Sequence, residues 1–397
     1  MRIYLIPYTY KTYLNANQFH SGIDVALLSQ FRALQDLGHE VGMFCAFGNV
    51  QNVYPNVDFI ADQFPDNEKL TRRYYQNVQK YMLERIADFQ PDVILSNYII
   101  NDVFYKNLSR FNVPIIYYSH AMPGSWADVK YGNFLYEFTK RNTFCCLSNF
   151  QYNKIVEFYR SRKKGAWEWQ FDEVIPDFVL PSQGAESNTS IQPHDNTVRH
   201  ISALNREKST FRLFDMLTNS CYNFEIYTSS NYKGFLQEEE KYYNTYASKY
   251  STFHDHVNLN ELHDKTMEVY GKSICNFVGL ASYDTFTITS LESLIRGVPL
   301  IVELNKNGQH PAFDMLPKEI ADKYIKGVEK RKTKPDEFQK IVDSFAKFTL
   351  KDRQELSNHV LSVLGKDKYL KNLQSLINTA SKKYNDANTN FGLEEFM

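Results

Sequence analysis

Hydrophobic positions in the first 180 residues alternate between two spacings. Continuous apolar runs, typical of strands buried on both faces of a parallel sheet, occur at 3–6, 41–46, 93–96, 115–118 and 144–147. Between the first two runs the spacing is helical, with one stripe made of Val25, Leu28, Phe31, Leu34 and Leu37. A second helical stripe lies within 74–89 and consists of Val78, Met82 and Ile86. This alternation of strands and helices predicts a doubly wound α/β domain.

The same alternation restarts in the second half of the chain. We expect strands at 200–204, 224–228 and 274–278, and helices at 210–217, 265–271, 336–347 and 369–382. Residues 181–196 are rich in Ser, Pro, Gly and Asn, which is typical of a linker. A chain of 397 residues also exceeds the usual size of one core. The sequence therefore predicts an N-terminal domain at 1–180, a linker at 181–196, a second domain at 197–365 and a terminal segment at 366–397.

Composition limits the partners that the chain can take. The formal net charge is −1, so a nucleic-acid partner would need local basic patches rather than a global attraction. The five cysteines show no metal-ligand spacing and favour a reducing compartment. The sequence opens on a strand-like segment rather than a signal peptide, and it has no apolar run of about 18 residues. We therefore expect a cytoplasmic protein without a membrane span.

The segment 284–302, DTFTITSLESLIRGVPLIV, is the most informative in the chain. It predicts a loop, a short helix capped by Thr289 or Ser290, a stop at Gly297 where a positive φ is needed, and a buried strand. Bare amides at the helix start, around Thr289, Ser290 and Leu291, together with the helix dipole make an anion site. Glu292, expected in the first turn, can reach a sugar hydroxyl beyond the phosphate. This combination suits a nucleoside diphosphate, although a plain helix-to-strand turn would share the pattern.

This segment resembles the Glu-x7-Glu signature of GT-B glycosyltransferases. The positions that match are Phe286, Leu291, Glu292, Gly297, Pro299 and Ile301. Asp284 replaces the first Glu, while Thr285 and Thr287 replace two glycines, which brings the loop closer to T-even phage DNA glucosyltransferases. Elsewhere, the run 38–41 (GHEV) and the run 174–179 (VIPDFV) resemble family segments. The resemblance implies a GT-B fold with two Rossmann-like doubly wound domains that face a central cleft, and a terminal helix that returns to the N-terminal domain.

The resemblance also implies roles for individual residues. Gly22 would let a ligand approach the first helix, and Arg206 and Lys208 would neutralise the donor diphosphate. His120, after the strand at 115–118, would lie in the ligand crevice beside the donor sugar, with Asp284 in the catalytic set. A neutral imidazole with an ordinary pKa of about 6.5 can also act as a base. Each residue has a plainer interpretation as a helix start, a solvated charge or a buried, hydrogen-bonded histidine.

Basic and aromatic residues gather in three places and suggest a DNA acceptor. The richest cluster contains Arg160, Arg162, Lys163, Lys164, Trp167 and Trp169. The other two span 72–75 and 326–334, and Trp126 adds an aromatic side chain to a flexible loop. Cations bind phosphates and aromatic rings stack on bases, including a base flipped out of the duplex. Charge runs are more often solvated faces, so this interpretation has an equal competitor.

Together these features predict a monomeric glycosyltransferase that moves a sugar from a nucleotide-sugar, UDP-linked by family analogy, to an acceptor hydroxyl. The predicted acceptor is a 5-hydroxymethyl pyrimidine in double-stranded phage DNA, which would place the enzyme in the host cytoplasm. One alternative is a bacterial transferase of cell-surface polysaccharide or lipid, and another is a non-catalytic GT-B-like binding module. No Asp-x-Asp metal motif is convincingly placed, so a divalent metal is possible but not required, and no tightly bound cofactor is expected.

Overall fold

The chain divides into two compact units that are described separately. The computed structural model describes residues 1–7, 22–45, 57–59, 72–97, 102–120, 138–160, 173–174, 191–202, 216, 220–227, 252–254, 271–280, 287–329 and 332–394. Unit 1 consists of Met1–Phe178 together with Lys366–Met397, and unit 2 consists of Val179–Gly365.

Unit 1 is built on a seven-stranded parallel sheet with the order β3-β2-β1-β4-β5-β6-β7. Its strands are β1 (Arg2–Ile6), β2 (Glu40–Cys45), β3 (Val57–Phe59), β4 (Val93–Ser96), β5 (Ile115–Ser119), β6 (Thr143–Cys146) and β7 (Glu173–Val174). The connecting helices are α1 (Gly22–Asp36), α2 (Arg72–Phe89), α3 (Asp102–Leu108) with the short η1 (Ser109–Phe111), and α5 (Asn149–Arg160). All residues of β4, β5 and β6 are buried, which confirms strands covered on both faces.

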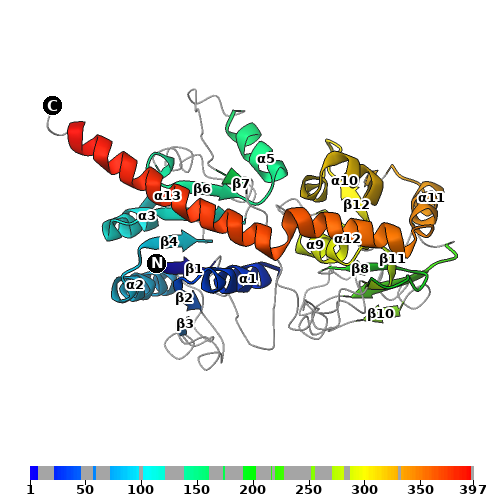
Figure 1. Cartoon of the computed structure of the whole chain (residues 1–397), viewed down its shortest axis with the longest axis horizontal. Coiled ribbons are helices and arrows are strands. Elements are labelled where there is room, and N and C mark those ends of the chain that lie inside the picture. The colour runs from blue at the N-terminus through cyan, green and yellow to red at the C-terminus, as the bar shows by residue number, and fades with distance from the viewer. Residues whose placement is uncertain are drawn as a thin grey trace. The chain divides into compact units, whose positions relative to one another are not determined.

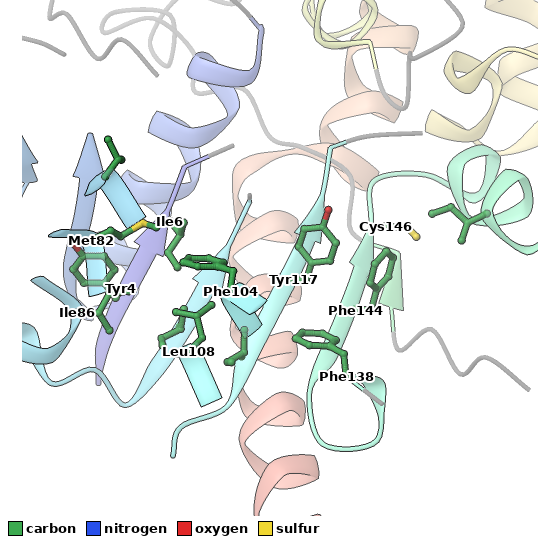
Figure 2. Packing of buried hydrophobic residues seen from close by; sticks show 14 residues of the cluster. Tyr4, Ile6, Met82, Ile86, Phe104, Leu108, Tyr117, Phe138, Phe144 and Cys146 are labelled. Atoms are coloured by element: carbon green, nitrogen blue, oxygen red, sulfur yellow. The ribbon is translucent and has the colours of Figure 1, made fainter. Parts of the chain in front are cut away.

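One face of this sheet carries an aromatic and aliphatic core. Figure 2 shows side chains from the strands, among them Tyr4, Tyr117 and Phe144, beside side chains from the helices, among them Met82 and Phe104. Tyr117 and Phe144 stack edge to face, with ring centroids 5.1 Å apart. Because these side chains come from neighbouring strands and from helices that follow different strands, their packing fixes the strand order.

The C-terminal helix α13 (Lys366–Glu394) belongs to unit 1, where it contacts α1 and β5 (Figure 1). Its buried stripe consists of Leu373, Leu376, Ile377 and Ala380, each with no exposed surface. His39 Nε2 lies 3.0 Å from Gln374 Oε1, and Lys366 Nζ lies 3.0 Å from Asp36 Oδ2. The end of the chain is thus tied to the first helix and the turn that follows it.

Unit 2 repeats the architecture with a six-stranded parallel sheet in the order β10-β9-β8-β11-β12-β13. Its strands are β8 (Thr197–Ile201), β9 (Asn223–Tyr227), β10 (Thr252–His254), β11 (Ser273–Val278), β12 (Leu300–Leu304) and β13 (Ile325–Glu329). Its helices are α9 (Ile288–Ile295), η3 (Pro311–Met315), α10 (Lys318–Tyr324), α11 (Pro335–Phe345) and α12 (Leu350–Leu364). Two doubly wound units, as predicted, therefore make up the chain.

Several expected boundaries differ from the structure. The strand expected at 200–204 begins at Thr197, because the strand contains two buried polar residues, Arg199 and His200, that interrupt its apolar pattern. The helix expected at 369–382 runs from 366 to 394, and β13, α10 and α12 were not expected. Of the helices expected at 210–217 and 265–271, only Met216 and Gly271 lie within the described residues.

Candidate functional site

Each sheet has a topological switch point at its carboxyl edge, where ligands of doubly wound folds bind. In unit 1 the strand order reverses between β1 and β4, and in unit 2 it reverses between β8 and β11. At the switch point of unit 1, Asn97 N, which directly follows β4, donates a hydrogen bond of 2.8 Å to the carbonyl oxygen of Ile6, the last residue of β1. His120 follows β5, the neighbour of β4, and α9 is the helix that follows β11. His120 is therefore one strand away from the switch point of unit 1, and α9 follows one of the two strands at the switch point of unit 2.

His120 ends a chain of three buried side chains from three elements. Its Nε2 lies 2.8 Å from Oδ1 of Asn97, which directly follows β4. Asn97 Nδ2 in turn donates to Gln30 Oε1 on α1 at 2.7 Å. Gln30 is 2%, Asn97 1% and His120 8% exposed. The sequence did not single out Asn97 or Gln30, although Asn97 stands directly after a predicted strand, as His120 does.

Burial decides the charge of His120. It lowers the pKa of the imidazole from its ordinary 6.5 to about 3, because the imidazolium would lose its hydration inside the protein. The ring is therefore neutral near pH 7, in agreement with the sequence-based expectation. Any base function of His120 would therefore be lost only at a pH well below the ordinary imidazole pKa of about 6.5.

The end of β5 beside His120 is held by a buried glutamine. Gln151 on α5 has no exposed surface, and its Nε2 donates to Ser119 O at 3.0 Å and to Ser119 Oγ at 3.1 Å. Its Oε1 accepts a hydrogen bond of 2.7 Å from Leu147 N, which follows β6. These bonds satisfy backbone groups beyond two strand ends and fix the backbone that carries the imidazole.

In unit 2, α9 starts earlier than the sequence predicted. Its N-cap is Thr287, so Thr289 and Ser290 lie inside the first turn rather than at the cap. Ser290 N and Leu291 N donate to Thr287 O at 2.9 and 3.2 Å, and the hydroxyls of Thr287 and Ser290 are 2.5 Å apart. The amides of Ser290 and Leu291 are thus already bonded within the turn. The predicted anion site narrows to the amides of the first two helical residues, Ile288 and Thr289.

Glu292 occupies the second turn of α9, not the first, because the helix begins at Ile288. The residue is 7% exposed. Its carbonyl oxygen accepts a hydrogen bond of 2.8 Å from Arg296 Nη1 one turn further on. Glu292 is therefore a buried acid on the helix that follows β11, the strand at the switch point of unit 2.

The opposite end of α9 is locked to α12. Gly297 has the predicted positive φ, at 70°, and a Cβ there would lie 2.3 Å from Arg353 O. Arg353 Nε donates to Gly297 O at 3.2 Å, and Ser357 Oγ donates to Ile295 O at 2.5 Å. Burial lowers the pKa of Arg353 to about 10, while the charge of Asp195 acts in the opposite direction. The helix that carries Glu292 is therefore fixed at its C-terminal end by two buried polar side chains.

Many predicted site residues lie outside the described part of the chain. These are Trp126, Arg162, Lys163, Lys164, Trp167, Trp169, Arg206, Lys208 and Asp284. Gly22 is the first residue of α1 and Arg160 the last residue of α5, and the side chain of Arg160 is not described. The roles predicted for these residues stay predictions.

The basic cluster at 326–334 is partly accounted for by local bonds. Lys326 lies on β13, and its Nζ donates to Asp322 O. Lys332 Nζ pairs with Glu329 Oε2 at 2.5 Å. These contacts agree with a solvated surface rather than with a surface reserved for DNA phosphates.

The described ranges contain neither a cluster of metal ligands nor a membrane-spanning helix. Within them, His, Cys, Asp and Glu side chains form no group of three or more that could hold a metal ion. Within the same ranges, no helix combines the length and the apolar character that crossing a membrane requires.

Comparisons with known proteins give the fold. No family model matches the sequence, and a search of curated proteins finds no match. Solved structures match over nearly the whole chain. Sucrose-phosphate synthase from Thermosynechococcus elongatus has a TM-score of 0.66 at 14% identity and covers 96% of this chain and 98% of its own.

Two further structures are similar to the same extent. Anabaena Alr3699/HepE, solved in complex with UDP-glucose, has a TM-score of 0.62 at 11% identity, with 96% and 100% of the two chains covered. The lipopolysaccharide outer core galactosyltransferase WaaB, in its apo form, has a TM-score of 0.63 at 12% identity, with 96% and 99% covered. At these identities the likeness shows the fold, and the chain has the GT-B architecture that the sequence predicted.

Proposed function

We propose that this chain is a glycosyltransferase that moves a sugar from a nucleotide-sugar, UDP-linked, to an acceptor hydroxyl. The observation that carries the proposal is the GT-B fold over nearly the whole chain, with the buried acid Glu292 on the helix beside the switch point of unit 2. The complex of HepE with UDP-glucose supports the choice of donor. The presence of Asp284, Glu292, His120 and Lys208 together argues against a binding module without activity.

Roles follow for the residues that the sequence singled out. Glu292 binds the donor ribose, and the amides of Ile288 and Thr289 at the start of α9 bind the diphosphate. Arg206 and Lys208 stabilise the charge that grows on the leaving diphosphate, which is where a preorganised cation contributes most. His120 lies nearest the reacting carbon, with Asp284 in the catalytic set and Gly22 at the entrance to the first helix.

The acceptor is a hydroxyl, for which the sequence offers two classes. The argument for a hydroxymethylated base in double-stranded DNA is based on Arg160 and on the basic and tryptophan residues at 162–169. Trp126 adds a further ring on which a base can stack. A saccharide or lipid acceptor is favoured by the likeness to the lipopolysaccharide galactosyltransferase. The local bonds of Lys326 and Lys332 weaken the argument for DNA that rests on the cluster at 326–334.

One assay tests both the reaction and the acceptor. Purified protein is incubated with a panel of nucleotide-sugars, and release of the nucleoside diphosphate is measured alone, with hydroxymethylated DNA, and with oligosaccharide or lipid acceptors. We expect release from a UDP-sugar that one acceptor class accelerates. Acceleration by DNA should weaken steeply with salt, because phosphate contacts release counterions. Release from no nucleotide-sugar under any condition would contradict the proposed function.

A further inference from the structure

The hydrogen bonds that link Gln30, Asn97 and His120 bear on which ring nitrogen of His120 carries the proton. A neutral imidazole bears its proton on one nitrogen and a lone pair on the other, and the hydrogen-bond partner of one nitrogen selects between the two tautomers. In this protein a buried amide, Asn97, lies 2.8 Å from Nε2. An amide presents an acceptor or a donor according to its orientation, so whatever orients Asn97 selects the tautomer of His120.

Gln30 is the group that orients Asn97. Asn97 Nδ2 donates to Gln30 Oε1 at 2.7 Å, which leaves Asn97 Oδ1 as the atom that faces His120 Nε2. The backbone of Asn97 is held as well, through its N–H bond of 2.8 Å to Ile6 O at the end of β1. Because Gln30 and Asn97 are almost fully buried, water does not compete readily for these bonds.

We propose that Gln30 and Asn97 are positioning residues that hold His120 in the Nε2–H tautomer, so that Nδ1 is the hydrogen-bond acceptor of the ring. The hydrogen bonds from Gln30 through Asn97 to His120, which we call the relay, join three elements around the switch point of unit 1. These elements are α1, the end of β4 and the end of β5. Its consequence for sugar transfer rests on the proposed function, since it makes Nδ1 the ring nitrogen that carries the lone pair. The tautomer itself does not depend on that function.

Nitrogen NMR of the full-length chain labelled with ¹⁵N-histidine tests the proposal directly. The chain has ten histidines, and the signals of His120 are those that disappear in a His120→Gln variant. We expect wild-type His120 at pH 7 to show Nδ1 at the shift of an unprotonated ring nitrogen and Nε2 at the shift of a protonated one. The reverse pattern would overturn the proposal, since it would mean that both amides are turned over and that Asn97 donates to the ring.

Variants test the two positioning residues. In Asn97→Leu, and to a smaller extent in Gln30→Leu, both ring nitrogens should move toward a common intermediate shift, because the tautomer is no longer fixed. Asn97→Asp should keep the Nε2–H pattern, since a carboxylate can only accept. If Asn97→Leu does not fold, the wild-type pattern, Asn97→Asp and Gln30→Leu still decide the matter. Unchanged shifts in both Leu variants would overturn the proposal.

A matched control separates positioning from packing. Asn142 is another buried asparagine of unit 1, whose Oδ1 accepts from Ile115 N at 3.0 Å and whose Nδ2 donates to Tyr105 Oη at 3.1 Å. Asn142 directly precedes β6 and bonds to the first residue of β5, whereas His120 follows the end of β5. Asn142→Leu should lower stability and leave the His120 shifts in place. If the His120 nitrogen shifts change equally in Asn142→Leu and Asn97→Leu, the effect comes from general packing and not from the bond between Asn97 and His120.

Turnover gives an independent reading if the chain transfers sugar. Asn97→Leu should lower kcat by about 10- to 100-fold, the usual cost of losing the partner that orients a functional histidine, while UDP affinity stays unchanged. Asn97→Asp should restore most of this loss. If no nucleotide-sugar reacts, the proposed function is wrong, but the NMR experiment still decides whether Gln30 and Asn97 fix the tautomer of His120. If the protein transfers sugar but the wild-type His120 ring shows the reverse tautomer, the tautomer proposal is wrong and the proposed function is unaffected.

Discussion

At the scale of single residues, buried polar groups differ in how their charge is balanced. Arg199 on β8 is 5% exposed, and its pKa is raised because Asp195 and Glu225 outweigh the opposing effect of burial. His120 bonds to the neutral amide of Asn97, and burial lowers its pKa to about 3. The first arrangement keeps a charge inside the protein, and the second excludes one.

The neutral state of His120 makes stability depend on pH. The unfolded chain takes up a proton near pH 6.5 and the folded chain only near pH 3, so the unfolded state binds more protons between these values. The free energy of unfolding should therefore fall as pH decreases through this window, by at most about 1.4 kcal/mol per pH unit. Urea denaturation of wild type and His120→Gln from pH 7 to pH 4 measures the difference. A difference that does not change with pH would contradict the assignment.

At the scale of elements, α9 is the best-supported part of the candidate donor site. Arg353 and Ser357 of α12 hold its C-terminal end, and Asn276 on β11 donates to Ser293 Oγ at 2.8 Å. These bonds place the helix that carries Glu292 against the sheet of unit 2. The positioning of Glu292 therefore depends on residues that do not themselves face the start of α9.

Two glycines with nearly the same φ test this packing. Gly297 has φ 70° and contacts the backbone of Arg353, whereas Gly308 has φ 73° and nothing within 4 Å of its missing Cβ. Alanine at either site costs about 1–2 kcal/mol for the left-handed backbone. Gly297→Ala should cost about 1–3 kcal/mol more, because its Cβ overlaps Arg353 O. Equal losses in the two variants, measured by denaturant unfolding, would show that α12 does not pack against Gly297 as described.

The sequence predicted best the elements whose apolar pattern follows from burial alone. Strands such as β4 and β5 are apolar over most of their length because both faces are buried, and pattern alone finds them. Helix α12 was missed because it buries Arg353 and Ser357 while leaving Leu350 50% and Leu361 40% exposed. The place of His120 after a strand was predictable, but its relay joins residues 67 and 23 positions apart, which only the fold brings together.

At the scale of the molecule, the end of the chain contributes to the stability of the unit formed by its beginning. The buried stripe of α13 includes Leu376, which has no exposed surface and lies in the same compact unit as α1 and β5 (Figure 1). Hydrogen bonding of His39 to Gln374 adds a polar tie. Burial lowers the pKa of His39, while that hydrogen bond acts in the opposite direction.

A pair of leucine substitutions measures this contribution. Leu376→Ala should destabilise the protein by about 2–5 kcal/mol, because it leaves a cavity in a closed interior. Leu361→Ala, at a position 40% exposed on α12, should change stability by less than about 1 kcal/mol. Denaturant unfolding of the two variants gives both values. Similar losses would contradict the buried place of α13.

The central claim is that the chain binds a nucleotide-sugar through Glu292, and calorimetric titration of UDP measures this most directly. The matched control is Glu319→Ala, which removes an exposed acid from α10. We predict that wild type and Glu319→Ala bind UDP alike, and that Glu292→Ala and Glu292→Gln lose about 1–3 kcal/mol of binding free energy, the value of a hydrogen bond to a charged group. Wild-type protein that binds no UDP, or Glu292 variants with unchanged affinity, would contradict the account.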